Sequence, residues 1–379
     1  MTATSDCSAD RMMDATTMDA PVQDVTGEAP GSADLRTVSA VIINFNGIDT
    51  LPKTLHALND CGFPFADVIV VDDGSTDGSV DYIRQYHPDV DVVAFPKNTR
   101  NTSLVRNSGL RRVKTPFALL LDNDVTVLKD SIEKLLDTAA GNEKLLAITP
   151  RLLDEEDHDS IYMDGSILHF LGLTIKASPA KRIAESNLTD PFPSFGSGIM
   201  LVRMEIAERI GLFDEQYAFG WGDDGEFHIR GRLMGYDVLH HPGAPFFHAA
   251  KQHGKKRAYA QLHNRYRFIL TYYSKTTLLV LLPSLLIFEL ALFTAMLAMG
   301  AVGDWFRAIT DNWRSRKSLL ERRRLLQRQR KVDDTKILSS GYFQLPGLLS
   351  NGKFATTMAK TVAAPLNFNW FLAGALYHL

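Results

Sequence analysis

The sequence predicts an α/β protein in which a mostly parallel β-sheet is flanked by helices, followed by a helical region that associates with a membrane. Two observations predict the sheet: apolar, strand-like runs alternate with helical patterns, and the runs end in polar or acidic residues. A third observation predicts the C-terminal region, where an almost wholly apolar segment precedes a strongly basic one.

Three apolar runs predict buried strands, and they begin at Val38, Val68 and Leu119. Leucines at helical spacing between positions 51 and 58 follow the first run. Because ligands of open α/β sheets bind outside the carboxyl ends of the strands, the polar residues there are candidate site residues. They are Asn44 after the first run, Asp72 and Asp73 after the second, and Asp122 and Asp124 after the third.

The pair Asp122 and Asp124 is the most informative of these groups. Side chains two positions apart on an extended backbone point the same way, so both carboxylates can reach one hard divalent cation. Acidic residues are also common turn formers after a strand. The pair alone therefore leaves a metal site and a simple turn both open.

A second acidic cluster lies far downstream, where Trp221 precedes Asp223, Asp224 and Glu226. A helix that begins near Asp223 would carry three acids in its first turn, where they complement the helix dipole, so helix capping is the structural alternative. Aromatic residues just before the acids exclude water and raise the pKa of a carboxylate, as a general base requires.

Together these motifs resemble glycosyltransferase family 2, which has the GT-A nucleotide-diphospho-sugar transferase fold and usually inverts the anomeric configuration. The likeness covers roughly residues 38 to 248 and includes rhamnosyltransferase-like surface-glycan enzymes of bacteria and archaea. It implies that Arg106, in a segment resembling Ala-Arg-Asn-x-Gly, binds the base or the diphosphate. It further implies donor binding by Asn44, Asp72, Asp73 and Asp122, with Asp72 on the base, Asp122 near the ribose and Asp124 as the direct metal ligand.

Later motifs resemble the acceptor half of such enzymes. The segment from Phe195 to Met200 resembles a loop of small residues below the active site, which implies acceptor contacts from Gly196 and Ser197. Residues 223 to 226 resemble the element that carries the catalytic base, but both outer acids depart from the family's usual residues. We assign the base to Asp224, with Asp223 as the alternative, and the acceptor to Trp221 and Glu226. Finally, His248 matches a histidine that some members return to the metal, although a lone histidine is often structural.

The implied reaction transfers a sugar from a UDP-, dTDP- or GDP-linked donor to a hydroxyl of a glycan or lipid-linked acceptor, with Mg²⁺ or Mn²⁺ as cofactor. A nucleotidyltransferase is one alternative, but no Gly-rich, basic phosphate loop follows the first strand. A catalytically silent nucleotide-sugar-binding or membrane-scaffolding protein is another. The presence of both Asp124 and Asp224 argues against it.

Composition agrees with an enzyme of this kind. The chain has 379 residues, 45% hydrophobic and 22% charged, with a net charge of −3 that gives no sign of nucleic-acid binding. Two cysteines without a CxxC motif exclude a disulfide framework and a cysteine-based zinc site. We expect residues 1–36 to be a disordered acidic tail and residues 37–270 to form the catalytic domain.

Residues 271–303 are expected to form a hydrophobic membrane-associated element. The apolar run is long enough to span a bilayer, but Pro283 and Glu289 interrupt it and both flanks are basic. We therefore favour an in-plane or re-entrant helical hairpin bent near Pro283, at the cytoplasmic face, over a single span or a buried soluble helix pair. Residues 304–379 are expected to form basic amphipathic and interfacial helices, since 311–331 hold nine basic and two acidic residues.

Overall fold

The structure is a computed structural model that describes residues 37–64, 67–217, 222–249, 258–340 and 370. The described residues from Thr37 onward belong to one compact unit. The predicted tail, residues 1–36, lies outside the described residues, as do residues 341–369 and 371–379 of the predicted helical region 304–379.

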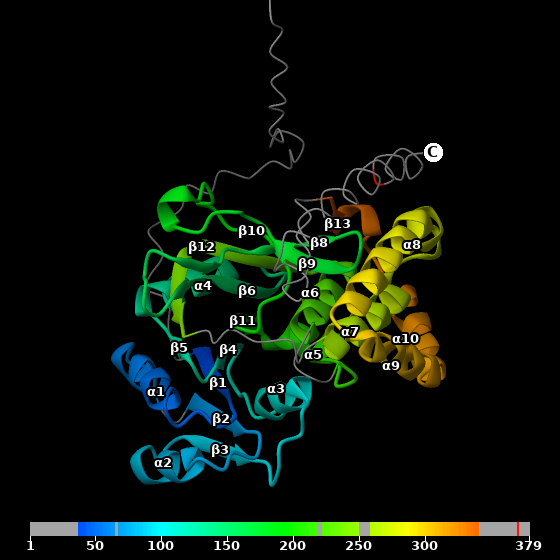
Figure 1. The fold of residues 1–379 in the computed structure, drawn as a ribbon. Helices are drawn as coiled ribbons and strands as arrows, with labels where there is room; N and C mark the ends of the chain where they lie inside the picture. The colour runs from blue at the N-terminus through cyan, green and yellow to red at the C-terminus, as the bar shows by residue number, and fades with distance from the viewer. Residues whose placement is uncertain (1–36, 65–66, 218–221, 250–257, 341–369, 371–379) are drawn as a thin grey trace, which may run out of the picture. The chain divides into compact units, whose positions relative to one another are not determined.

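The first half of the chain alternates strands and helices, as the apolar runs predict (Figure 1). Its elements are β1 (Val38–Asn44), α1 (Leu51–Asp60), β2 (Val68–Asp72), α2 (Ser79–Tyr86), β3 (Asp91–Ala94), α3 (Thr102–Leu110), β4 (Phe117–Asp122), β5 (Val125–Thr126), α4 (Lys129–Ala140) and β6 (Leu145–Asp154). The three predicted strands are therefore confirmed, and each ends at or next to its predicted site residue.

The second half adds short strands and then a group of helices. Its elements are β7 (Ile161–Met163), β8 (Ser166–His169), β9 (Leu173–Lys176), β10 (Phe192–Pro193), β11 (Met200–Arg203), α5 (Met204–Ile210), α6 (Asp223–Leu233), β12 (Asp237–His248), α7 (Ala258–Tyr272), α8 (Lys275–Ala298), α9 (Val302–Arg314), α10 (Arg316–Gln329) and β13 (Leu338–Ser339). The predicted helix start near Asp223 is confirmed.

The main sheet of the described residues has the order β10-β12-β6-β11-β4-β1-β2-β3, with β5 and β7 paired at its side. Strands β4, β1, β2 and β3 are parallel, whereas β11 runs antiparallel between β4 and β6, so the sheet is mixed. Along β1, Ala40 and Ile42 face a core built with α1, α2 and α4, while Val41 faces a core built with α3 and α5. Helices therefore cover both faces of the sheet.

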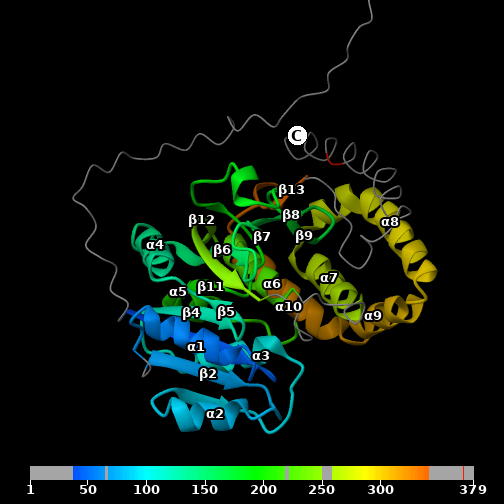
Figure 2. The same ribbon diagram turned by 60° about the vertical axis from the view of Figure 1, so that its left-hand side comes forward.

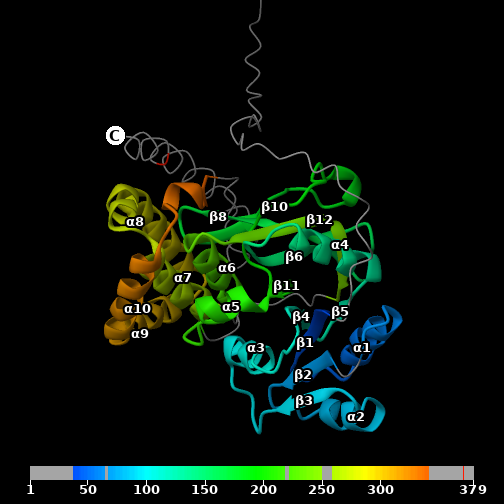
Figure 3. The same cartoon turned by 180° about the vertical axis from the view of Figure 1, so that it is seen from behind.

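A third apolar core joins β8, β9 and α6 to helices α7, α8, α9 and α10. In all three views these C-terminal helices lie together, and α1 and α2 lie away from them (Figures 1, 2 and 3). Among the described residues, α8 is the one helix long and apolar enough to cross a membrane by length and composition. It runs unbroken through Pro283, so the predicted bend near Pro283 is wrong, while the in-plane placement at a membrane stays a prediction.

Pro283 is compatible with this continuous helix because its ring faces outward and the rest of the helix packs on a neighbour. Pro283 is exposed, whereas Ser284 and Leu281 beside it are buried in the core. The missing backbone donor costs one helical hydrogen bond, which the burial of the opposite face of α8 offsets. The predicted bend rested on the local cost of proline in a helix, and the packing of α8 outweighs that cost.

Candidate active site

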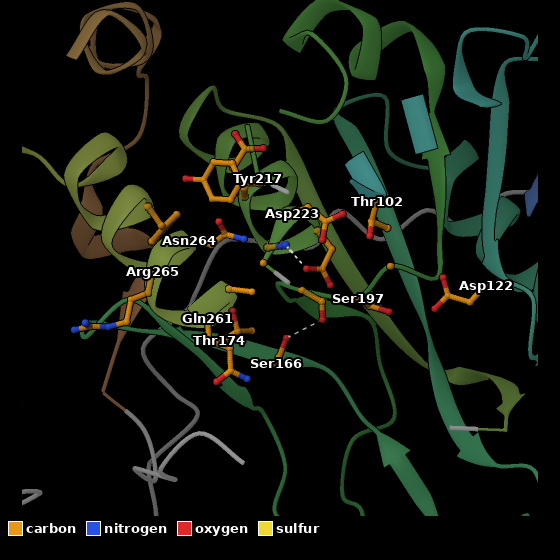
Figure 4. A pocket seen from close by; sticks show the side chains of 18 of the residues that line it. Thr102, Asp122, Ser166, Thr174, Ser197, Tyr217, Asp223, Gln261, Asn264 and Arg265 are labelled. Atoms are coloured by element: carbon orange, nitrogen blue, oxygen red, sulfur yellow. Dashed lines mark hydrogen bonds between the residues drawn. The ribbon is translucent and has the colours of Figure 1, made fainter. Parts of the chain in front are cut away.

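The carboxyl ends of β1, β2 and β4 open into a cavity of about 1030 Å³. Its walls also come from β9, the loop before β11, the start of α6, and helices α7 and α8. Figure 4 shows Asp122 on one side, Arg265 and Asn264 of α7 on the other, and Asp223 and Ser197 between them. This volume lies at the upper end of the ~300–1,000 Å³ typical of a site for one small ligand, so the cavity has room for two substrates.

Three side chains at one end of the cavity form a candidate divalent-metal site. One ligand atom from each of Asp122, Asp124 and His248 lies within 4.8 Å of the others. His248 comes from β12, which pairs with β5 just after Asp124, and this pairing brings its Nε2 to 3.2 Å from an Asp124 oxygen. Two carboxylates and an imidazole suit Mn²⁺ or Mg²⁺, so these residues fit the predicted cofactor.

The electrostatics of this triad favour a cation. Burial raises the pKa of Asp122, and the nearby charge of Asp124 raises it further against the effect of Arg106. Burial lowers the pKa of His248, but its hydrogen bond to Asp124 and the charge of Asp122 raise that pKa overall. The two carboxylates repel each other and favour the protonated form of the imidazole, and a bound divalent cation would relieve the same repulsion.

Asn44 connects three strand ends beneath the predicted donor site. Its Nδ2 donates to Asp72 at 2.7 Å and to Ser75 at 3.3 Å, and its Oδ1 accepts from Asn123 at 2.6 Å. A Cβ at Gly47 would lie 1.9 Å from the side-chain amide nitrogen of Asn123, so only glycine fits there. The amide network thus fixes the loop that carries Asp122 and Asp124.

The two acids at the end of β2 have different environments, and the predicted contact of Asp72 with the base stays a prediction. Asp72 is buried, and its oxygens accept from Asn44 and from the Ser75 backbone N–H at 2.8 Å. Asp73 lines the cavity, and one of its oxygens accepts from the Thr99 N–H at 2.8 Å. Because Asp72 is used internally, Asp73 is the better placed acid for a donor nucleotide.

Arg106 connects the metal end of the cavity to the start of α6. Its Nη1 pairs with Asp223, and its Nη2 lies 3.8 Å from Asp122. Both Arg106 and Asp223 are buried. A Cβ at Gly198 would lie 2.2 Å from Arg106 Nη2, so the small loop residue makes space for the guanidinium. Arg106 therefore positions two acids, and donor binding by Arg106 stays a prediction.

Asp224 is the acid best suited to be a base. It lines the cavity and is partly exposed, whereas its neighbour Asp223 is buried against Arg106. Burial raises the pKa of Asp224 to about 6, with a further increase from Asp223 and a decrease from Arg106. A carboxyl group with this pKa is ionised at neutral pH and is more basic than an ordinary aspartate.

Glu226 is part of an internal ion pair, which gives no support to its predicted acceptor contact. Its two oxygens accept from Arg230 Nε at 2.7 Å and Nη2 at 3.0 Å, and the Tyr272 hydroxyl also donates to it. Glu226 and Arg230 are both buried. This carboxylate fixes α6 to α7, and removing one partner of such a pair would leave an uncompensated buried charge.

The small-residue loop lies at the cavity wall as predicted, and Gly196 and Ser197 both line the cavity. Gly196 has a φ of +76°, and its N–H donates to His228 Nδ1 at 2.9 Å. Burial and the charge of Arg106 lower the pKa of His228 to about 3, so this histidine is a neutral acceptor. Contact of Gly196 and Ser197 with an acceptor stays a prediction, and Trp221 lies outside the described residues.

Several cavity residues carry no motif that sequence reasoning could use. Thr174 of β9 and Gln261 and Asn264 of α7 line the cavity (Figure 4). A Cβ at Gly225 would lie 3.5 Å from Thr174 Oγ1, which shows how closely β9 approaches the start of α6. Only tertiary packing brings these polar groups to the site. His228, which holds the small-residue loop, was also missed.

Comparisons with known proteins match this fold and site. The model of glycosyl transferase family 2 matches residues 39–211. A putative teichuronic acid biosynthesis glycosyltransferase, TuaG, of Bacillus subtilis is 33% identical over 103 residues, which cover 26% of this chain and 40% of that protein. Hyaluronan synthase of Pasteurella multocida is 27% identical over 218 residues, covering 51% of this chain and 22% of that protein. The chain thus matches less than half the length of each of these two relatives.

Among solved structures, GalNAc-T7 with UDP, GalNAc and Mn²⁺ aligns with a TM-score of 0.53 at 18% identity, over 63% of this chain and 48% of that chain. This likeness concerns the fold. The mixed sheet with acids at its strand ends is that of a GT-A glycosyltransferase. Residues 39–211 belong to glycosyl transferase family 2, so the predicted family and fold are confirmed.

Proposed function

We propose that the protein is an inverting glycosyltransferase that moves a sugar from a nucleotide-diphosphate donor to a hydroxyl of a glycan or lipid-linked acceptor. The reaction would belong to cell-surface polysaccharide or glycoconjugate synthesis, at the cytoplasmic face of a membrane. One observation carries the proposal: a single cavity is lined both by the candidate metal ligands and by Asp224, whose pKa is raised.

The donor would lie over the carboxyl ends of β1, β2 and β4, with Asp73 and Asn44 on the nucleotide side. Asp122, Asp124 and His248 would hold Mg²⁺ or Mn²⁺, which as a Lewis acid neutralises charge on the departing nucleoside diphosphate. The group transferred would be a hexosyl or rhamnosyl sugar, and the similar proteins include a putative teichuronic acid biosynthesis glycosyltransferase and a hyaluronan synthase.

Asp224 would remove the proton from the acceptor hydroxyl while its oxygen attacks the anomeric carbon. Arg106 neutralises the neighbouring Asp223, which leaves Asp224 as the partly exposed carboxylate of the pair. Direct attack from the face opposite the leaving group inverts the anomeric configuration. No nucleophilic carboxylate is needed for a single displacement.

A donor screen tests the proposal. UDP-, dTDP- and GDP-sugars with Mn²⁺ should be compared by thermal shift, because a ligand at 100 times its dissociation constant stabilises the folded state by ~2.7 kcal/mol. We expect one nucleotide class to stabilise the protein and to be hydrolysed slowly to the nucleoside diphosphate without an acceptor. In a parallel reaction with a nucleoside triphosphate and a sugar phosphate, formation of a nucleotide-diphosphate sugar with release of pyrophosphate would identify a nucleotidyltransferase instead. Binding without any hydrolysis or transfer would identify a silent binding protein.

A further inference from the structure

Helix α8 presents a continuous apolar face to solvent. Leu279, Leu286, Leu290 and Leu297 are 73%, 61%, 68% and 58% exposed, and their spacing places them along one side of the helix. Between residues 276 and 298 the sequence has one charged residue, Glu289. An exposed apolar stripe of this length indicates a surface that is covered in the working protein. We call these four leucines the outer face of α8.

The opposite side of α8 is fixed to the rest of the fold. Phe288, Leu292 and Met296 are buried in the core shared with α7. Glu289 accepts hydrogen bonds from Arg265 Nη1 at 3.1 Å and Trp305 Nε1 at 2.7 Å, and from the hydroxyl of Tyr266. The charge in the apolar helix is therefore compensated by groups of α7 and α9.

Both ends of α8 are attached to the same body. At its N-terminal end, Ser274 N–H donates to Asp334 at 2.8 Å. Beyond its C-terminal end, α9 returns to α7, where the Tyr259 hydroxyl donates to Asp311 at 2.9 Å and Asn312 donates to the His263 carbonyl at 3.0 Å. A helix crossing a bilayer would have to place its two ends on opposite sides, and these contacts oppose that separation.

The neighbouring helix α9 extends the exposed apolar surface, and α10 after it adds positive charge, with six basic residues and one acidic residue. Phe306 and Trp313 of α9 are 55% and 68% exposed. Arg307 and Arg314 follow them by one position each; both pair with Asp311, at 3.7 and 3.0 Å, and are largely exposed, at 64% and 77% of their side chains. Arg316 of α10 stacks over the Trp313 ring at 4.8 Å. Tryptophan beside arginine at the edge of an apolar surface is typical of a membrane interface.

From these contacts we infer that α8 lies flat on one leaflet of an anionic membrane, with its outer face in the acyl boundary and the arginines of α9 and α10 at the head groups. The charge complementarity selects a lipid surface over a second copy of the chain. Because Phe288, Leu292 and Met296 on the inner side of α8 also line the catalytic cavity, docking places that cavity beside the head groups. The inference goes beyond the proposed function and does not depend on the sugar transferred.

Vesicle binding tests the surface. The full chain should co-float with 3:1 phosphatidylcholine and phosphatidylglycerol vesicles, and more weakly with phosphatidylcholine alone. The double variant Leu286→Glu, Leu290→Glu should weaken this binding by at least about tenfold, because charged groups enter the apolar boundary poorly. Tyr86→Glu, at a 60% exposed aromatic residue of α2, is the matched control and should bind as the parent does. Unchanged vesicle binding in the double variant, or a dimer that does not bind vesicles, would overturn the inference.

Depth measurements separate flat docking from a span. A fluorophore is attached to one cysteine introduced at Leu279, Leu286 or Leu297 in a chain whose Cys7 and Cys61 have been replaced, and nitroxide lipids of known depth quench it. The first and last sites are 18 residues apart, about 27 Å along a helix at 1.5 Å per residue. Flat docking gives three equal, shallow depths. A middle site near the bilayer centre, with end sites near opposite surfaces, would show that α8 spans the membrane and refute flat docking.

Discussion

Lowering the pH from 7 to 5 should slow sugar transfer about tenfold if Asp224 is the base. Its pKa of about 6 means that roughly nine-tenths of the carboxyl groups are ionised at pH 7 and roughly one-tenth at pH 5. An ordinary aspartate, with a pKa near ~3.9, would stay more than about 90% ionised at pH 5 and would give almost no change. The rate therefore falls as the pH falls through 6.

The assay is single-turnover transfer at saturating donor and Mn²⁺, so that titration of the metal ligands does not limit the rate. Asp224→Asn should reduce transfer by at least ~100-fold, keep donor affinity, and remove the acid limb of the pH profile. Asp223→Asn should keep measurable transfer and move the acid limb to lower pH, because the charge of Asp223 raises the pKa of Asp224. An acid limb near pH 4 in the parent protein would refute the reasoning. Loss of the base signature in Asp223→Asn alone would place the base at Asp223.

Three further results are expected. Asp124→Asn should abolish Mn²⁺-dependent donor binding in calorimetry, since it removes ligand charge and keeps side-chain size; unchanged affinity would reject the metal assignment. Arg106→Gln should lower the free energy of unfolding in urea by about 3 kcal/mol, because it leaves Asp223 buried without its partner. Adding Asp223→Asn should restore part of the loss. Equal stability of the parent and the single variant would contradict this. Burial raises the pKa of Asp164, but hydrogen bonds from His240 and Arg151 lower it overall to about 2. The ionised group should therefore stabilise the fold by roughly 2 kcal/mol above pH 4, and this contribution should be lost as the pH falls towards 2. The pH-dependent contribution should be absent in Asp164→Asn.

The predicted site separates into two groups of residues. Asn44, Asp73, Asp122 and Asp124 follow buried strands, and the cavity at the carboxyl ends of those strands contains all four. The local sequence pattern was sufficient for them because an apolar run predicts a buried strand. In a parallel sheet, the last residues of such strands lie at the same edge of the sheet.

Residues whose roles depend on distant partners could not be assigned in this way. The sequence offers three similar acids at 223, 224 and 226, and the structure distinguishes them by partner: Arg106 for the first, cavity exposure for the second, and Arg230 for the third. A buried ion pair consumes the charge of a carboxylate, whereas an unpaired, partly buried carboxylate keeps a raised pKa. For Asp223 the partner is 117 positions away, whereas Arg230 is four positions from Glu226 and the pair is recognised only by its burial in the fold.

The sequence by itself determined the α/β class, the strand ends that carry the donor-side acids, the resemblance to glycosyltransferase family 2 and the apolar character of residues 276–302. Only the tertiary structure decided that Pro283 lies within an unbroken helix, and that Glu289 there has partners on α7 and α9. It also decided that His248 meets Asp124 through the pairing of β5 with β12. The physical reason is that periodicity and propensity act over a few neighbouring residues, whereas the burial of a charge, or its compensation, depends on which distant elements pack against it.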